Sequence, residues 1–106
     1  MADRDPRMSA PTLKVLRFLL VENTPEASGA AISKATGVGA GTLYPLLGRL
    51  EKARWIEGEW EKIDPKEEGR PRRRFYSLTG IGITRARSAL ADFQMPRLMG
   101  EPSWNG

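Results

Sequence analysis

The residues of this sequence best suited to chemistry are four arginines at positions 70–74, where only Pro71 interrupts them. A guanidinium can fork onto a phosphate with two hydrogen bonds or enter a narrow minor groove. Five basic and two acidic residues between Lys66 and Arg74 give this segment a local charge of +3. Such a cluster would provide salt-dependent affinity for nucleic acid. The alternative interpretation is a solvated loop that carries charge for solubility.

A second group of candidates lies at positions 39–44. Residues 39–41 are glycine or alanine, which would let the backbone approach a phosphate closely. Thr42 and Tyr44 follow in the first turns of a predicted helix, where recognition helices place residues that contact base edges and phosphates. For Tyr44, the alternative is a half-buried packing residue. Three basic residues and one acidic residue lie within 39–54, so positive charge also gathers here.

The composition gives little support to enzymatic chemistry. The sequence has no cysteine and no histidine, which excludes disulfides, thiolate metal sites and serine–histidine triads. Glu57, Glu59 and Glu61 alternate like the solvated face of a strand rather than a catalytic pair. The glycines at 37, 39 and 41 are not followed by the lysine of a P-loop. We expect a protein that is not an enzyme and that uses no metal or organic cofactor.

Two helices are predicted in the first third of the chain. The first begins at Ser9 or Thr12, repeats leucine at 13, 16, 19 and 20, and ends at the Asn-Thr-Pro of 23–25. Ser28 is expected to cap the second helix and Gly37 to end it. Its expected apolar stripe consists of Ala31, Ile32 and Ala35.

A third helix is predicted over about 40–53, with Pro45 tolerated in its first turns. One buried face is expected from the spacing of Leu43, Leu46, Leu47 and Leu50.

After residue 54 the apolar period changes to two, which predicts strands at 55–63 and 73–78. Trp55 and Trp60 are expected to pack in the core or under the hairpin. The charged stretch 64–70 is the predicted hairpin tip. Thr79 is then expected to cap a last helix that runs to about Gln94 and is stopped by Pro96.

This order of elements predicts a mainly α fold, a winged helix-turn-helix with a three-helix core, a two-stranded β-wing and a C-terminal helix. A chain of 106 residues suffices for one domain, and its net charge of +4 favours polyanionic partners. The charged N-terminus lacks the apolar segment of a signal peptide, and no apolar stretch is long enough for a membrane span. We therefore expect a cytoplasmic protein.

Two segments of the chain resemble the PadR family of transcriptional repressors. Residues 37–51, GVGAGTLYPLLGRLE, resemble the most characteristic run of the family. Residues 69–79, GRPRRRFYSLT, followed by Gly82, resemble its wing and the turn after it. Both occur in the family's order and at its spacing, and the resemblance covers roughly residues 12–93.

The resemblance implies a small winged-helix repressor that contacts DNA through its third helix and its wing. The implied DNA-binding residues, with Lys66 of the basic segment added, are Gly41, Thr42, Tyr44, Pro45, Arg49, Lys66, Arg70, Arg72 and Arg73. Members commonly release DNA when a small, often aromatic, effector binds near the dimer interface. Two features depart from the family's pattern: the long C-terminal helical region of larger members is missing, and residues 28–31 lack a glycine–tyrosine pair.

The resemblance also implies a homodimer, formed through the last helix together with the first. The implied contact residues are Leu13, Leu16, Leu20, Ile83, Ala86, Leu90 and Phe93. The predicted organisation is then a flexible segment at 1–8, the winged-helix domain at 9–79, a dimerisation helix at 80–95 and a disordered tail at 96–106.

The sequence thus predicts a dimeric repressor that binds double-stranded DNA at a palindromic operator. Its two recognition helices would lie about 34–36 Å apart, in successive major grooves. The alternative is a winged-helix module that binds another protein and no specific DNA. A steep loss of duplex affinity between low and physiological salt would distinguish the DNA-binding protein from that module.

Overall fold

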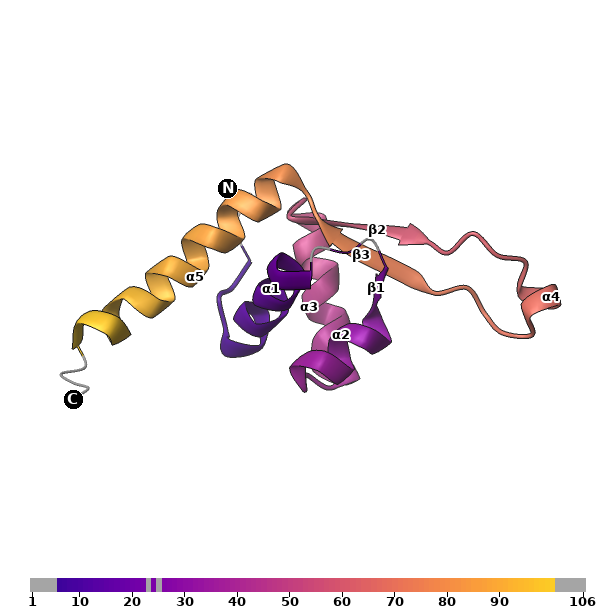
Figure 1. Ribbon diagram of the computed structural model, residues 1–106, viewed down its shortest axis with the longest axis horizontal. Helices are drawn as coiled ribbons and strands as arrows, with labels where there is room; N and C mark the ends of the chain where they lie inside the picture. The colour runs from indigo at the N-terminus through magenta and orange to yellow at the C-terminus, as the bar shows by residue number, and fades with distance from the viewer. Residues whose placement is uncertain (1–5, 23, 25, 101–106) are drawn as a thin grey trace.

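Three helices pack together in the middle of the molecule, and two long projections leave this core in opposite directions (Figure 1). The computed structural model describes residues 6–22, 24 and 26–100, with side chains as far as Phe93. The elements are α1 (Ala10–Glu22), β1 (Ala27–Ser28), α2 (Gly29–Thr36), α3 (Ala40–Lys52), β2 (Ile56–Trp60), α4 (Pro65–Glu68), β3 (Arg74–Leu78) and α5 (Gly80–Gly100).

Helices α2 and α3 form the helix-turn-helix, and local hydrogen bonds fix the turn between them. Ser28 caps α2 as predicted, since its Oγ accepts a hydrogen bond from the N–H of Ala31 at 3.1 Å. Gly37 ends α2 with a φ of 79°, a left-handed conformation that favours glycine. The Ser33 hydroxyl then donates to the carbonyl of Val38 at 2.7 Å, which holds the turn against α2.

The leucine stripe of α3 is the centre of the core. Leu43, Leu46, Leu47 and Leu50 are all buried, as their spacing predicts, and they pack with α1 residues such as Leu16. The predicted stripe of α2 is only partly right, because Ile32 is buried whereas Ala31 and Ala35 are exposed. Gly29 lies on the buried face in their place, one helical turn before Ile32.

The sheet has three strands in the described part of the chain, in the order β1–β3–β2, rather than the two that the sequence predicted. Ala27 pairs with Tyr76 and Ser28 with Phe75, so the residues just before α2 are fastened to the wing. Both pairings in the sheet are antiparallel. A strand of two residues is too short to carry a period-two signal, which explains why the sequence did not reveal it.

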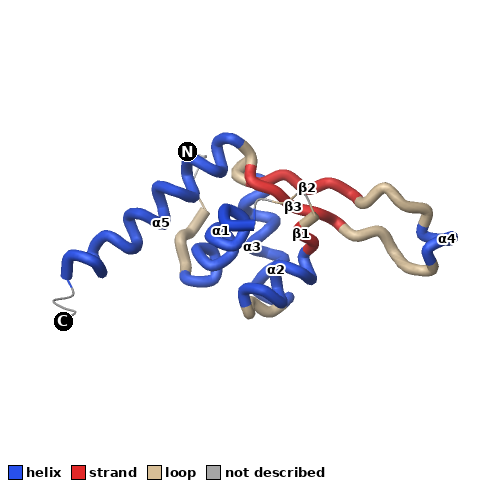
Figure 2. The backbone as a smooth tube through the Cα atoms, in the orientation of Figure 1, coloured by secondary structure: helices blue, strands red, loops and turns tan. Residues whose placement is uncertain are grey.

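The tip of the hairpin contains a single helical turn, α4, where the sequence predicted a loop (Figure 2). Asp64 Oδ1 accepts a hydrogen bond from the N–H of Lys66 at 3.0 Å, and Pro65 occupies the first helical position. Gly69 closes the turn with a φ of 70°. The sequence therefore contains the N-cap, the first-turn proline and the C-terminal glycine of a helix, all within residues 64–69.

Helix α5 begins as predicted but ends later. The hydroxyl of Thr79 accepts a hydrogen bond from the N–H of Gly82 at 2.9 Å and donates to the carbonyl of Arg54 at 2.7 Å. The prediction that Pro96 stops the helix is wrong, because α5 continues to Gly100. A proline removes one N–H and crowds the preceding turn, which bends an exposed helix without ending it when its neighbours favour helix.

The described part of the N-terminal segment lies against the core. Met8 packs against the core and Pro6 is half-buried, because both contribute apolar surface beside α5. Residues 1–5 and 101–106 of the predicted flexible ends lie outside the described residues.

Gly82 offers a test of how α5 is seated on the core. A Cβ atom at position 82 would overlap the carbonyl oxygen of Trp55, which is backbone and cannot swing aside. We expect Gly82→Ala to lower the free energy of unfolding by about 1–3 kcal/mol, the usual cost of overpacking, as measured by urea denaturation.

The matched control for Gly82→Ala is Gly80→Ala. The same helix has open space around a Cβ atom at position 80 among the described residues, and alanine favours helix over glycine. Gly80→Ala should therefore leave stability unchanged or raise it. Wild-type stability in Gly82→Ala would contradict the close packing of α5 on Trp55.

Candidate nucleic-acid interface

The outer face of α3 carries the residues that the sequence singled out. Because the leucine stripe faces inward, Gly41, Thr42, Tyr44, Pro45 and Arg49 are all exposed to solvent. This arrangement makes the side chains of α3 available to a partner along its whole length.

Tyr44 is held in place by its neighbour in α2. Its side chain is 49% exposed, yet its ring lies against Gly29, where any Cβ atom would collide with it. Because residue 29 at the start of α2 is a glycine, the ring of Tyr44 from α3 can pack directly against the backbone of α2. The remaining surface of Tyr44 faces solvent.

Arg70, one of the predicted DNA-binding residues, forms an ion pair within the hairpin. Its two terminal nitrogens donate to the two carboxylate oxygens of Glu61 at 2.8 and 2.9 Å, and the N–H of Arg73 adds a bond of 3.1 Å to the same carboxylate. This fork crosses the base of the wing tip. The two bonds to one carboxylate give Arg70 a role in shaping the hairpin, and its contact with DNA stays a prediction.

The same fork changes how Glu61 titrates. The hydrogen bonds from Arg70, helped by the N–H of Arg73, lower the pKa of Glu61 to about 2 against the opposing effect of partial burial. The carboxylate of Glu61 likewise raises the pKa of Arg70. Glu61 was interpreted from the sequence as part of a solvated face, and only its pairing across the hairpin reveals its role.

Arg72 and Arg73 are the exposed arginines of the wing. Arg72 uses its Nε to donate to the carbonyl of Ile63 at 3.0 Å and is exposed to solvent. Within the described residues, the side chain of Arg73 makes no hydrogen bond or ion pair. Lys66 is also exposed, in α4 at the wing tip. These three cations match the prediction of a basic wing that is open to solvent.

Arg74 ties the wing to the recognition helix, a role that the sequence did not indicate. Its Nη2 donates to Glu51 Oε2 of α3 at 2.7 Å, and this interaction raises the pKa of Arg74. Its guanidinium also lies 5.1 Å from the centre of the Trp60 ring. Gly58 makes this route possible, because a Cβ atom there would collide with the guanidinium. In the sequence, only Gly58, placed in a strand across from the arginine-rich segment, could have indicated that a large side chain crosses there.

The two tryptophans of the wing region have different environments. Trp55 is buried as predicted, with 4% of its surface exposed. The prediction that Trp60 packs in the core or under the wing is wrong, because 58% of Trp60 is exposed. Trp60 ends β2 opposite Arg74, beyond the reach of the leucine core.

A groove of about 330 Å³ joins these elements. It is bounded by the start of α2 (Ser28–Ala30), by Tyr44 of α3, and by Trp60, Arg72–Arg74 and Tyr76 of the sheet. Burial raises the pKa of Tyr76, with Glu51 nearby adding to the effect. The structure thus brings the predicted residues Tyr44, Arg72 and Arg73 to the edges of one groove.

The residues predicted to form a dimer contact divide into two groups. Leu13, Leu16 and Ala86 are buried inside the chain where α1 packs against α5, so they are core residues and the prediction for them is corrected. Leu20, Ile83 and Leu90 are half-buried, whereas Phe93 is 50% exposed.

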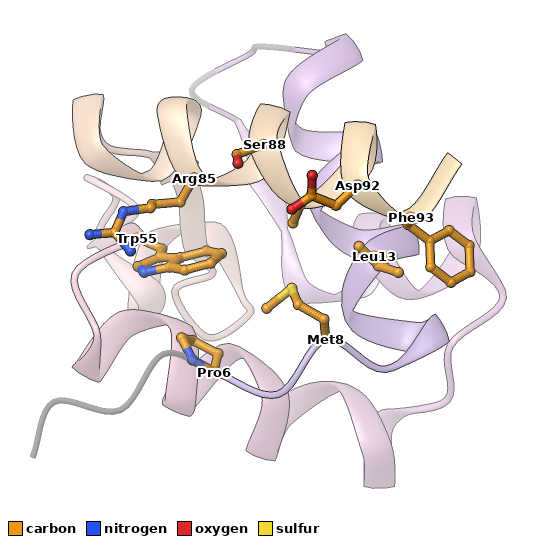
Figure 3. A pocket seen from close by; sticks show the side chains of 9 residues that line it. Pro6, Met8, Leu13, Trp55, Arg85, Ser88, Asp92 and Phe93 are labelled. Atoms are coloured by element: carbon orange, nitrogen blue, oxygen red, sulfur yellow. The ribbon is translucent and has the colours of Figure 1, made fainter. Parts of the chain in front are cut away.

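Phe93 lies at the edge of a second cavity of about 380 Å³ (Figure 3). The N-terminal residues Pro6 and Met8, the ring of Trp55 and the 85–93 face of α5 enclose it.

The described residues contain no group of three or more acidic residues, histidines or cysteines placed to hold a metal ion. None of the helices among them combines the length and the hydropathy that crossing a membrane requires.

Comparison with known families identifies the chain. The family model described as the transcriptional regulator PadR-like family matches residues 27–88, more than half of the sequence. The chain belongs to the PadR-like family of transcriptional regulators. The matched segment contains α2, α3, the whole wing and the start of α5, so the family assignment rests on the part that forms the candidate interface. No curated protein is significantly similar to this PadR-like chain.

Solved structures share the fold of this PadR-like protein. A G34K mutant of MepR from Staphylococcus aureus superposes with a TM-score of 0.70 at 20% identity, over 87% of this chain and 63% of MepR. A PadR-like regulator from Bacillus cereus gives 0.65 at 24% identity, over 83% and 84% of the two chains. Reduced AbfR bound to DNA gives 0.62 at 23% identity, over 79% and 56%. The chain spans less than two thirds of the MepR molecules that it resembles.

The fork at Glu61 predicts a pH-dependent contribution to stability. Because the folded pKa is about 2 and the ordinary value is 4.5, the contribution is complete above 4.5 and is lost as the pH falls toward 2. We expect the difference in unfolding free energy between wild type and Glu61→Gln to be constant near neutral pH and to shrink across this window. Urea denaturation at a series of pH values measures it.

Glu59→Gln is the control for the Glu61 experiment, since it removes the same charge from an exposed position in β2, two residues before Glu61. The unfolding free energy of Glu59→Gln should differ little from that of wild type at every pH in the series. A Glu61→Gln difference that stays the same down to pH 2 would show that the fork does not stabilise the folded chain.

Proposed function

We propose that this PadR-like protein is a dimeric, sequence-specific DNA-binding repressor that reads a palindromic operator. In this proposal α3 enters the major groove and the wing tip reaches the adjacent minor groove. The observation that supports it best is the single groove that Tyr44 of the recognition helix shares with Arg72 and Arg73 of the wing. One duplex can then contact both elements at once.

Each element has the chemistry that its position requires. Thr42, Tyr44 and Arg49 offer hydroxyl and guanidinium groups that hydrogen-bond to base edges and phosphates. Arg72, Arg73 and Lys66 offer exposed cations on the wing. AbfR, a protein with the same fold, has been solved bound to DNA, and the proposal extends that partner to this chain.

A dimer is proposed because a palindromic operator has two half-sites and this chain carries one recognition helix. Helix α5 supplies the surface, since its C-terminal half extends away from the three-helix core (Figure 1). Phe93 is an exposed aromatic residue on that half. The cavity beside Phe93 and Trp55 is the proposed place for an aromatic effector, because rings and aliphatic side chains form most of its wall. We place this activity in the cytoplasm.

Arg73→Ala tests DNA binding against the alternative of a protein-interaction module. We expect it to weaken binding to operator and random duplex alike, and to reduce the slope of log affinity against log salt by about 0.9 for each phosphate that the variant no longer neutralises. Fluorescence anisotropy with labelled duplexes from site selection measures both. Arg87→Ala, which removes an exposed arginine from α5, should change neither quantity.

The comparison of Arg73 with Arg87 has a definite negative result. If wild-type protein shows no steep salt dependence with any duplex, or if both variants lose the same affinity, the wing is not a DNA-binding element. The protein-interaction module would then be the better assignment.

Phe93→Asp tests the dimer. A charge at the centre of an apolar interface between two copies of α5 should convert the dimer into monomers in sedimentation velocity and reduce operator affinity at least ten-fold. Ile81→Asp is the matched control, because Ile81 is 58% exposed on the same helix near the wing. Dimers that survive in Phe93→Asp would exclude this face of α5.

A further inference from the structure

Trp60 is a large aromatic side chain that the chain leaves in solvent beside its recognition helix. It is 58% exposed at the end of β2, where it pairs with Arg74 across the hairpin. It borders the same groove as Tyr44, Arg72 and Arg73. Single exposed aromatic residues are common on protein surfaces, so the case depends on how Trp60 is held and on what surrounds it.

The indole of Trp60 is held in position. The guanidinium carbon of Arg74 lies over its ring, 5.1 Å from the centroid, and the guanidinium donates a hydrogen bond of 2.7 Å to Glu51 of α3. Gly58 leaves the space that the arginine occupies. A side chain that is ordered before binding loses little conformational entropy when a partner covers it.

The charges around Trp60 define the chemistry of a partner. No aspartate or glutamate is among the residues that line the groove, whereas three arginines are. Glu51 compensates the charge of Arg74, so the cations left for a partner are Arg72 and Arg73. An occupant must therefore offer negative charge to the arginines and apolar surface to the indole. The sugar–phosphate backbone of DNA has both, at alternating positions.

The position of the groove selects the same occupant. With α3 in a major groove about 12 Å wide and the wing in the next minor groove, one DNA strand must pass between the two elements. The surface that joins α3 to the wing carries Trp60 and Arg74. The strand that separates the two grooves would cross this surface.

We propose that Trp60 packs against a deoxyribose of that strand, and that Arg74 is a positioning residue that holds the indole and binds no phosphate itself. The inference rests on the proposed function, because it requires α3 and the wing to contact duplex DNA. It adds Trp60 to the proposed DNA-binding residues and gives Arg74 a role that acts through the indole.

Trp60→Ala, measured beside Arg73→Ala, tests the proposal on the whole 106-residue chain with an operator duplex from site selection. We expect Trp60→Ala to bind roughly five- to thirty-fold more weakly, the range for truncating an aromatic residue at a covered interface, with an unchanged salt slope. Arg73→Ala should instead reduce the slope. In hydroxyl-radical footprinting, Trp60→Ala should lose protection at one sugar position in each half-site. Trp60→Phe should restore most of the affinity.

Arg74→Lys tests the positioning role, because lysine keeps the positive charge but cannot stack as a plane on the indole. We expect it to lose the same sugar protection as Trp60→Ala at an unchanged salt slope. If Arg74→Lys instead behaves as wild type while Arg74→Ala reduces the slope, Arg74 is a phosphate ligand and the positioning role is wrong.

The outcomes separate this inference from the proposed function. If wild type and Arg73→Ala behave as expected but Trp60→Ala retains wild-type affinity and footprint, the role of Trp60 is wrong and the DNA-binding function remains. If wild type binds no duplex, both are wrong. Since Trp60 is largely exposed, its variants should keep the wild-type thermal midpoint, which excludes misfolding as the cause of any reduced affinity.

Discussion

The burial of one face of α3 determines what the rest of the molecule can present. Four leucines on that face are fully enclosed by α1, α2 and the sheet, and this burial fixes the rotation of α3 about its own axis. The polar residues between the leucines are thereby forced outward as one set. The apolar stripe thus provides the free energy that holds the helix and also determines which side chains meet a partner.

The wing depends on two carboxylates for its shape. Glu61 forms an ion pair with Arg70 within the hairpin, and Glu51 of the recognition helix forms one with Arg74. Half of the arginine cluster is therefore structural, and its charge is compensated inside the chain. The remaining pair, Arg72 and Arg73, is exposed. Surface ion pairs contribute modestly to stability, so their main effect here is to decide which arginines stay available and where they stand.

The sequence predicted the features that depend on local chemistry. The leucine period of α3, the caps at Ser28 and Thr79 and the left-handed Gly37 were all recognisable, because each is determined within one turn of helix. The outward orientation of Thr42 and Tyr44 followed from the same period. The DNA contacts, the dimer and the effector are predictions of another kind, because they involve molecules outside the chain.

What the sequence could not reveal depends on interactions between distant residues. The two-residue strand β1 exists only because β3 is beside it. Likewise, Arg70 and Arg74 are indistinguishable from Arg72 and Arg73 along the chain, since only the hairpin register brings a carboxylate to two of them. Trp60 is exposed because it lies beyond the end of the core. The alternation of residues along a strand predicts which face is apolar, but not how far along the strand the core extends.

The space above Gly58 has a consequence for how related sequences can vary. The guanidinium of Arg74 fills that space on its way to Glu51, so residues 51, 58 and 74 occupy one shared volume and one shared charge balance. A side chain at position 58 would displace the guanidinium of Arg74. Without Arg74, Glu51 would lose its ion pair, and position 58 would no longer need to be glycine. We therefore expect residues 51, 58 and 74 to vary together among related sequences.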